Sequence, residues 1–458
     1  MATAPSAPAN SSPNLDIGLV LSGGGARGAY EAGAMSVLLP LLTKRGERPG
    51  LVLGTSIGAL NAGHMVATAH LPVRESLDRL IRVWNDVQLS DIIGPLIHPI
   101  SAWRMMSYVG GLVGFPFARV PAVLDTSPLH PLLNRIIDFD QIHFNTDKEL
   151  GALAVVATSY ATGESMVFHE GPTGVSVESD VKRGIRYVPS RVDASHVQAS
   201  ASIPMAFQGT YISSPADMDG WYGDGGTRLN TPTKPTLKLG AKKVVIIGLN
   251  SSAPPNSADP GMPDIFDGAG QGLQALFADP LAQDVGTLAS ANREVLMRDD
   301  DGDGIPDDAH HLIPYIFVAP RDRLTVGKLA AEVFRKHFRG VGAMLRARDL
   351  MMMGSFLGAG NSPTRGELFS MLFFATEFHS ALIELGRADA ERWLTLNHDD
   401  GPWRYGDPPL PDPKPAAVPL RKAKVAATTQ ANGASAPAKP SGTNATAKKP
   451  TTKVGAAG

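Results

Sequence analysis

The chain has 458 residues, of which 43% are hydrophobic and 19% charged, a composition typical of a globular protein with a sizeable core. Its formal net charge of −2 gives no global attraction to nucleic acid, and the lack of cysteine excludes disulfides and thiol catalysis. The N-terminus lacks the basic start and apolar core of a signal peptide, and no uncharged apolar stretch has the length of a membrane span. We therefore expect a protein that is cytoplasmic or peripheral at a membrane.

Composition and periodicity divide the chain into four segments. Residues 1–14 are rich in Ala, Pro, Ser and Asn and are expected to be disordered. Residues 15–250 alternate strand and helix patterns and form the expected core. Residues 251–405 are expected to be an insertion with an acidic loop, a sheet-edge strand and C-terminal helices. Residues 406–458 form a basic tail rich in Pro, Ala and Lys, which is also expected to be disordered.

The first elements of the core follow a strand, loop, helix, strand order. Residues 17–21 read as a buried strand, residues 29–42 as a helix and residues 51–53 as a second strand. Alternation of this kind implies parallel strands joined by right-handed crossovers. The expected fold class is α/β, with a mainly parallel central sheet flanked by helices, an insertion and a helical C-terminal portion.

The sequence Gly54-Thr55-Ser56-Ile57-Gly58 lies between the second strand and a helix-like stretch at residues 59–65. A strand, a sharp turn with one serine between glycines, and a helix are the context of a nucleophile elbow. The turn requires small neighbours, here Gly54 and Gly58, and places the serine oxygen at the positive end of the following helix. An ordinary tight turn between strand and helix is the alternative interpretation.

The glycine-rich run after the first strand has two functional interpretations. Gly23-x-Gly25-x-x-Gly28 matches the dinucleotide-binding fingerprint, which requires an acidic residue at the end of the second strand. The nearest acidic residue, Glu47, precedes that strand instead. In the other interpretation, the run forms an oxyanion hole, in which backbone N–H groups point at charge developing beside the Ser56 oxygen. A turn that merely permits close packing is the structural alternative.

A candidate general base follows later in the core. Residues 151–158 read as a strand, residues 163–169 as part of a hairpin, and residues 242–249 as a further strand. Between them, Asp224 is followed by Gly225 and Gly226. A serine hydroxyl needs a base to take its proton, and a buried aspartate with a raised pKa performs this role. A surface turn is the alternative, because Asp and Gly are common turn residues.

The glycine loop, the Gly-Thr-Ser-Ile-Gly elbow and the later Asp-Gly-Gly, in this order, resemble the patatin-like phospholipases of bacterial type. The core of the resemblance covers roughly residues 16–250, including the hairpin near residues 163–164 and the segment at 199–204. A closing stretch at residues 382–390 also resembles the family. It implies a patatin-like acyl hydrolase fold and a serine–aspartate dyad, with Ser56 as nucleophile and Asp224 as its base. It also implies that the oxyanion loop consists of Gly23, Gly24, Gly25, Arg27 and Gly28. Arg27 would orient this loop or meet a phosphate group.

Histidines provide a test of the dyad against a conventional triad. His169 and His196 precede Asp224, whereas the order of an α/β hydrolase places the histidine after the acid. His310, His311 and His337 follow Asp224 but lie in no recognisable motif. We therefore expect none of them to act as the base.

An acidic loop in the second half is a candidate calcium site. Asp299, Asp301, Asp303 and Asp307 place oxygen ligands at alternating positions around Gly302 and Gly304, which suits a hard cation such as Ca²⁺. Position 12 of an EF-hand loop beginning at Asp299 would be His310 instead of glutamate, and only one copy is present. A solvated acidic turn is the alternative. A calcium ion here would be structural, and catalysis is expected to require no cofactor.

Other parts of the second half and one apolar segment lack chemical motifs. Residues 91–123 are expected to be a lid over the site or an irregular packed insertion. Residues 251–285 are expected to be loop-rich, residues 312–318 an edge strand, and residues 326–353 and 364–397 helices. The basic tail is expected to be a linker or to touch anionic surfaces.

Together with these patterns, the resemblance implies a serine hydrolase that cleaves phospholipid or lysophospholipid esters through an acyl-enzyme. Its partners would be the lipid substrate and, transiently, a membrane surface, and no nucleic acid is expected. The alternatives are a catalytically silent scaffold or membrane-surface binder, and a nucleotide-binding protein that uses the glycine loop.

Overall fold

The computed structural model describes residues 14–96, 122–171, 177–253, 265–297, 312–338, 340, 347–358, 363–396 and 401–409. These residues belong to one compact unit, Met1–Ala416. The acidic loop at 299–307, the middle of the apolar segment at 97–121 and the tail from residue 410 lie outside the described residues.

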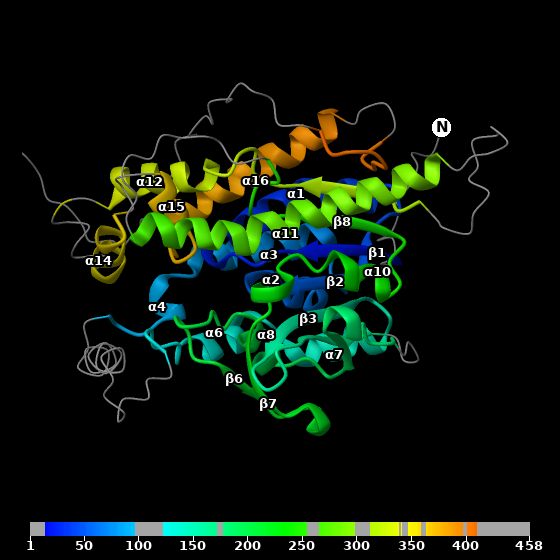
Figure 1. Ribbon diagram of the computed structural model, residues 1–458, viewed down its shortest axis with the longest axis horizontal. Coiled ribbons are helices and arrows are strands. Elements are labelled where there is room, and N and C mark those ends of the chain that lie inside the picture. Colours follow the sequence, from blue (N-terminus) through cyan, green and yellow to red (C-terminus); the bar gives the residue numbers. More distant parts are fainter. Residues whose placement is uncertain are drawn as a thin grey trace, which may run out of the picture. The chain divides into compact units, whose positions relative to one another are not determined.

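A single sheet forms the centre of the unit (Figure 1). Its strands are β1 Asn14–Leu21, β2 Pro49–Thr55, β3 Ala152–Ser159, β4 Ser165–Glu170, β5 Ile185–Pro189, β6 Thr210–Ile212, β7 Gly220–Asp224, β8 Lys243–Ile247 and β9 Tyr315–Val318. The main order is β5-β4-β3-β2-β1-β8-β9, and β7 pairs with both β3 and β6. The pairs from β3 through β2, β1 and β8 to β9 are all parallel. The predicted mainly parallel α/β sheet and the edge strand β9 are thus confirmed.

Helices cover both faces of this sheet. In the first half they are α1 Gly28–Lys44, α2 Ile57–Ala67, α3 Val73–Asp86, α4 Leu89–Ile92, α6 Leu129–Ile136, α7 Phe139–Asp147, α8 Ala194–Ser200, α9 Gly226–Leu229 and α10 Thr233–Lys238. In the second half they are α11 Ile265–Leu296, α12 Thr325–His337, α14 Arg348–Phe356, α15 Pro363–Ser370 and α16 Thr376–Leu396. Short 3-10 turns lie at Gly25–Arg27, Val181–Arg183 and Ala216–Met218.

Adjacent residues of β1 show which helices cover which face. Gly18 lies against Thr236 of α10, whereas the next residue, Leu19, lines a small space together with Leu39 of α1 and Met65 of α2. Because successive strand residues point to opposite faces, α10 and the pair α1 and α2 lie on different sides of the sheet. The long α16 packs along α1, so α16 belongs to the same layer as α1 (Figure 1).

Helix α11 differs from the expected loop at residues 251–285. Its glycines and Pro280 lower helix propensity, and for that reason the sequence favoured a loop. A stripe at helical spacing is nevertheless buried: Leu281, Val285, Leu288 and Ala289. Burial of such a stripe stabilises a helix more than local propensity does.

The two long C-terminal helices that the sequence predicts are each interrupted. In the first, α12 ends at His337 and a separate helix, α14, begins at Arg348; the second breaks between Ser370 and Thr376. In the second break, the Met371 carbonyl accepts a hydrogen bond from the Ala26 N–H at 2.9 Å, and the Phe374 carbonyl accepts one from the Leu89 N–H at 3.2 Å. These backbone groups are bonded outside the helix, so the helix need not continue to satisfy them. Among the described helices, none combines the length and apolar composition that a membrane-spanning helix requires.

Candidate active site

Ser56 occupies a strained turn between β2 and α2. Its backbone angles are φ 54° and ψ −122°, an unfavourable region for a residue with a side chain, and it is the N-cap of α2. A Cβ at Gly54 would collide with the backbone of Gly58, and a Cβ at Gly58 would collide with the Leu21 carbonyl. The turn therefore requires glycine on both sides, and the structure has the geometry of a nucleophile elbow.

Asp224 lies at the end of β7, where it pairs with Ala157 of β3, the strand adjacent to β2. Its side chain is buried, and it lies close enough to the Ser56 side chain for Ser56 to influence its pKa. Burial raises the pKa of the Asp224 carboxyl to about 7, although the hydrogen bond from the Gly226 N–H and the neighbouring Ser56 side chain act in the opposite direction. A carboxyl with this pKa exchanges protons readily near neutral pH.

The small-residue segment at 199–204 supports both of these side chains. The Ser200 hydroxyl accepts a hydrogen bond from the Ser56 N–H at 2.8 Å and donates one to the Val156 carbonyl at 2.6 Å. Two residues later, the Ser202 carbonyl accepts a hydrogen bond from the Asp224 N–H at 2.9 Å. One segment thus fixes the backbone of the serine and of the aspartate in a common frame.

The glycine loop after β1 lies directly beside Ser56. A Cβ placed on Gly23 would lie 3.0 Å from the Ser56 Cβ, so only glycine permits this approach without a shift of the chain. The Gly23 N–H is bonded to the Asn230 side-chain oxygen at 3.1 Å. Among the described residues, no acceptor is bonded to the N–H groups of Gly24 and Gly25. These two groups are the loop's candidate donors to an oxyanion.

Arg27 ends the 3-10 turn of the glycine loop, and each of its guanidinium nitrogens donates a hydrogen bond. Its side chain donates hydrogen bonds to Ser370, Asn250 and Glu367, and its Nη2 lies 2.7 Å from the Glu367 Oε2. Burial raises the pKa of the Glu367 carboxyl, and the charge of Arg27 opposes this rise. Arg27 is therefore placed to orient the loop, the first of the two roles that the sequence left open. Gly28 serves packing, because a Cβ there would lie 2.6 Å from the Trp84 ring.

The break before α16 contacts the glycine loop and restricts its conformation. Gly25 has φ 60°, and a Cβ on it would collide with the Met371 carbonyl oxygen. That same oxygen accepts the Ala26 N–H. The conformation of the loop thus depends on a segment far away in the sequence.

An apolar cavity of about 30 Å³ opens beside Ser56. Its walls come from α2, α4, α6, the segment after α8 and the break before α16, and almost all of its lining is apolar: Gly25, Ile57, Leu60, Ile92, Leu129, Leu133, Val197, Ala201, Ile203, Phe207, Met371, Leu372 and Phe374. Such a cavity accepts hydrocarbon beside the serine oxygen.

Within the described ranges, no histidine is hydrogen-bonded to Ser56 or Asp224. His196 is buried and bonded to Asp193 and to the Ser214 carbonyl. His169 lies on β4, where burial lowers its pKa, and His337 is at the end of α12. His310 and His311 lie outside the described residues.

Glu47 is placed unfavourably for a dinucleotide. It precedes β2, and its carboxylate accepts a hydrogen bond from Trp403 at 3.0 Å and pairs with Lys243 at 2.9 Å. The glycine loop follows the carboxyl end of β1, which runs parallel to β2. Glu47 and the glycine loop therefore lie at opposite ends of these parallel strands.

The candidate calcium ligands Asp299, Asp301, Asp303 and Asp307 lie outside the described residues. Among the residues that are described, no group of three or more His, Cys, Asp or Glu side chains is placed to hold a metal ion. The calcium hypothesis stays a prediction from the sequence.

Several supporting residues carried no recognisable signal in the sequence. Ser200 and Asn230 bond the backbone of the elbow and of the glycine loop, and Glu367 pairs with Arg27. Ser200 lies in a run of small residues, which is a weak indication of close packing. Asn230 and Glu367 carried none, because their partners are far away along the chain.

Comparisons with known proteins find one family model and several solved structures that are similar to the chain. Residues 19–237 match the family model described as patatin-like phospholipase. The chain is similar to the crystal structure of VipD from Legionella pneumophila, with 17% identity, 67% of this chain and 62% of that chain covered, and a TM-score of 0.27. It is also similar to human GIVD cytosolic phospholipase A2 in complex with methyl gamma-linolenyl fluorophosphonate, with 11% identity, 84% and 60% covered, and a TM-score of 0.30. The chain thus spans less than two thirds of either structure. No curated protein sequence matches it.

Proposed function

Because residues 19–237 form a patatin-like phospholipase domain, we propose that the protein cleaves phospholipid or lysophospholipid esters with a Ser56–Asp224 dyad. Membership of this family supports lipid acyl hydrolase activity. The observation that supports the dyad most is the position of a strained, elbow-borne Ser56 beside a buried carboxyl with a pKa of about 7. An apolar cavity beside the serine suits the acyl side of a lipid ester.

The reaction would proceed in two halves. Ionised Asp224 takes the Ser56 proton while the Ser56 Oγ attacks the ester carbonyl carbon, and the Gly24 and Gly25 N–H groups stabilise the resulting oxyanion. The proton then passes from Asp224 to the leaving alkoxide oxygen, and the acyl group remains on Ser56. Asp224 next deprotonates a water molecule, which attacks the carbonyl carbon of the acyl-enzyme. The bond from that carbon to the Ser56 Oγ then breaks, Asp224 returns the proton to the Ser56 Oγ, and the fatty acid is released.

Two further elements belong to the proposal. Because phospholipids are aggregated in bilayers, the enzyme would make transient contact with a membrane surface during turnover. The steps above use no metal ion, and a calcium ion on the acidic loop would only stabilise that loop.

The test is ester turnover by the full chain, on a short-chain chromogenic ester and on dioleoylphosphatidylcholine vesicles. Ser56→Ala and Asp224→Asn are each expected to lower kcat by a factor of about 10³ or more. Exposed positions provide matched controls, namely Ser380→Ala and Asp86→Asn, which are expected to retain activity. Circular dichroism would establish that all four variants are folded.

The outcomes separate the alternatives. Activity that persists in folded Ser56→Ala would refute the mechanism. No turnover by a folded wild-type protein that still binds vesicles would favour the silent membrane-surface binder.

A further inference from the structure

A small pocket lies at the carboxyl ends of β8 and β9. The segments that follow these strands, residues 251–253 and 319–321, line it together with the second half of α16 and with Pro408 and Pro409. Because β8 and β9 run parallel to β1 and β2, the pocket lies at the same end of the strands as Ser56. In α/β sheets this is the end at which ligands bind.

Two arginines and one aspartate meet in this pocket. Arg321 Nε and Arg392 Nη2 each lie 3.5 Å from Asp389 Oδ1, so both contacts are loose ion pairs. The Asp389 side chain is 1% exposed, whereas the two arginine side chains are 27% and 25% exposed and can be reached from solvent. Among the described residues that line the pocket, Asp389 is the single carboxylate. One positive charge of the two arginines is therefore left unbalanced there.

Two buried atoms of this cluster also lack a hydrogen-bond partner among the described residues. They are Arg392 Nε, a donor, and Asp389 Oδ1, an acceptor, while Asp389 Oδ2 accepts a hydrogen bond from the Tyr30 hydroxyl at 3.0 Å. Leaving a buried donor or acceptor unpaired costs free energy. A ligand that carries both an anionic oxygen and an O–H group would pair with both atoms.

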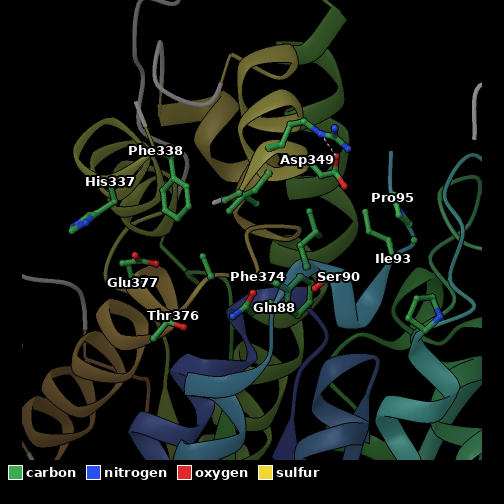
Figure 2. A pocket seen from close by; sticks show the side chains of 17 residues that line it. Gln88, Ser90, Ile93, Pro95, His337, Phe338, Asp349, Phe374, Thr376 and Glu377 are labelled. Carbon is green, nitrogen blue, oxygen red and sulfur yellow. Dashed lines mark ion pairs between the residues drawn. The ribbon is translucent and has the colours of Figure 1, made fainter. Parts of the chain in front are cut away.

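The large cavity enclosed by α4, α12, α14 and α16 has a different charge balance (Figure 2). Its volume is about 780 Å³, and Phe374 lines both this cavity and the apolar cavity of the active site. The basic groups in its described lining, His337 and Arg348, are matched by two carboxylates, those of Asp349 and Glu377. Arg348 and Asp349 form an ion pair at 3.6 Å. An excess of positive charge is thus a feature of the small pocket and not of this cavity.

The volume and the donors of the small pocket identify its ligand. About 40 Å³ is room for an ion of a few heavy atoms, whereas drug-sized ligands need several hundred Å³. Guanidinium groups bind the oxygens of phosphate in pairs, and a singly protonated phosphate also carries an O–H group. We propose that this pocket binds a singly protonated phosphate group, whose oxygens accept hydrogen bonds from Arg321 and Arg392 and whose O–H donates to Asp389 Oδ1. The group is either inorganic phosphate or the end of a phosphate monoester.

Calorimetric titration of inorganic phosphate into the full chain near neutral pH tests this site. Arg392→Gln and Arg321→Gln each remove one guanidinium and are each expected to weaken binding about tenfold or more. Arg387→Gln removes the same charge from α16 outside the pocket and is expected to bind phosphate as the wild type does. No saturable binding by the folded wild type, or equal binding by the wild type and a folded pocket variant, would overturn the inference. Arg321 follows β9 and Arg392 lies on α16, so either variant suffices if the other fails to fold.

Sulfate and a phosphate-bearing lipid complete the test. Sulfate is also tetrahedral but carries no proton near neutral pH, so it cannot donate to Asp389 and is expected to bind about tenfold more weakly. Equal affinity for sulfate would overturn the assignment of a protonated phosphate.

Co-sedimentation with phosphatidylcholine vesicles, with and without phosphatidic acid, identifies the source of the phosphate group. Extra binding to phosphatidic acid that Arg392→Gln and Arg321→Gln abolish assigns the pocket to a lipid monoester, whereas phosphate binding without it assigns the pocket to the free ion. None of these measurements uses ester turnover, so their result is independent of the proposed function.

Discussion

Arg27 Nη2 lies 2.7 Å from Glu367 Oε2, 340 residues further along the chain, and each side chain is only 6% exposed. This ion pair joins the glycine loop beside Ser56 to α15, which lies beyond the 19–237 family domain. The geometry of the candidate oxyanion hole thus depends on the C-terminal helices as well as on the matched domain.

Removing one partner of the Arg27–Glu367 ion pair should lower the free energy of unfolding. Glu367→Ala leaves the Arg27 charge buried without its counterion, and such changes typically cost about 3–5 kcal/mol. Glu367→Gln keeps a side-chain acceptor for Arg27 and is expected to cost less. Urea unfolding would measure both, with the exposed Glu384→Ala as control. Equal stability of Glu367→Ala and wild type would show that the pair contributes nothing.

Gly25 should tolerate no side chain, because alanine at φ 60° is strained and its Cβ would meet the Met371 carbonyl. Gly46 has a similar φ of 73° but open space around it. Both alanine variants are expected to lose about 1 kcal/mol to backbone strain. Only Gly25→Ala should also lose ester turnover, by a factor of about 10² or more for a displaced oxyanion donor. Similar kcat values for the two variants would contradict the role of the loop.

The pH profile should report the ionisation of Asp224. Only the ionised carboxyl accepts the Ser56 proton, so kcat/KM for a short-chain ester should rise with pH through an apparent pKa of about 7. Activity would be lost as the pH falls below that value. A profile that is flat between pH 5 and 8 would mean that a different group acts as the base.

Asp224 should also make the fold less stable at high pH. Its pKa is raised from 3.8 to about 7, so the folded state binds more protons than the unfolded state between these values. The free energy of unfolding should therefore fall by about 4 kcal/mol as the pH rises through this window. Asp224→Asn should show a smaller fall when urea unfolding is measured at pH 4.5 and pH 7.5. A steeper fall in the variant would be inconsistent with a raised pKa.

Glu31 offers a test of a second buried carboxyl group. It is buried on α1, where burial raises its pKa well above the usual range, and it accepts a hydrogen bond from Asn61 of α2 at 2.7 Å. A neutral acid is replaced closely by an amide, so Glu31→Gln should unfold within about 1 kcal/mol of wild type. Glu31→Ala leaves the Asn61 amide without this partner and should cost about 1–3 kcal/mol. Equal losses in the two variants would indicate that Glu31 is ionised in the folded protein.

The sequence by itself determined the local chemistry of this protein. Strands β1, β2, β3 and β8 each contain an apolar run, which is best buried in a sheet covered on both faces. The elbow around Ser56 was also evident, because a turn that requires glycine at fixed positions leaves that requirement in neighbouring residues. These features depend on residues within a few positions of each other.

Only the tertiary structure decided how the site is assembled. The pKa of Asp224 depends on burial, which Asp-Gly-Gly does not encode, since the same residues also form surface turns. Residues 364–397 read as one helix, yet the chain breaks at 371–375, where Met371 contacts the glycine loop and Phe374 separates two cavities. Such a break is stabilised by partners hundreds of residues away, and helix propensity, which is a local property, carries no information about them.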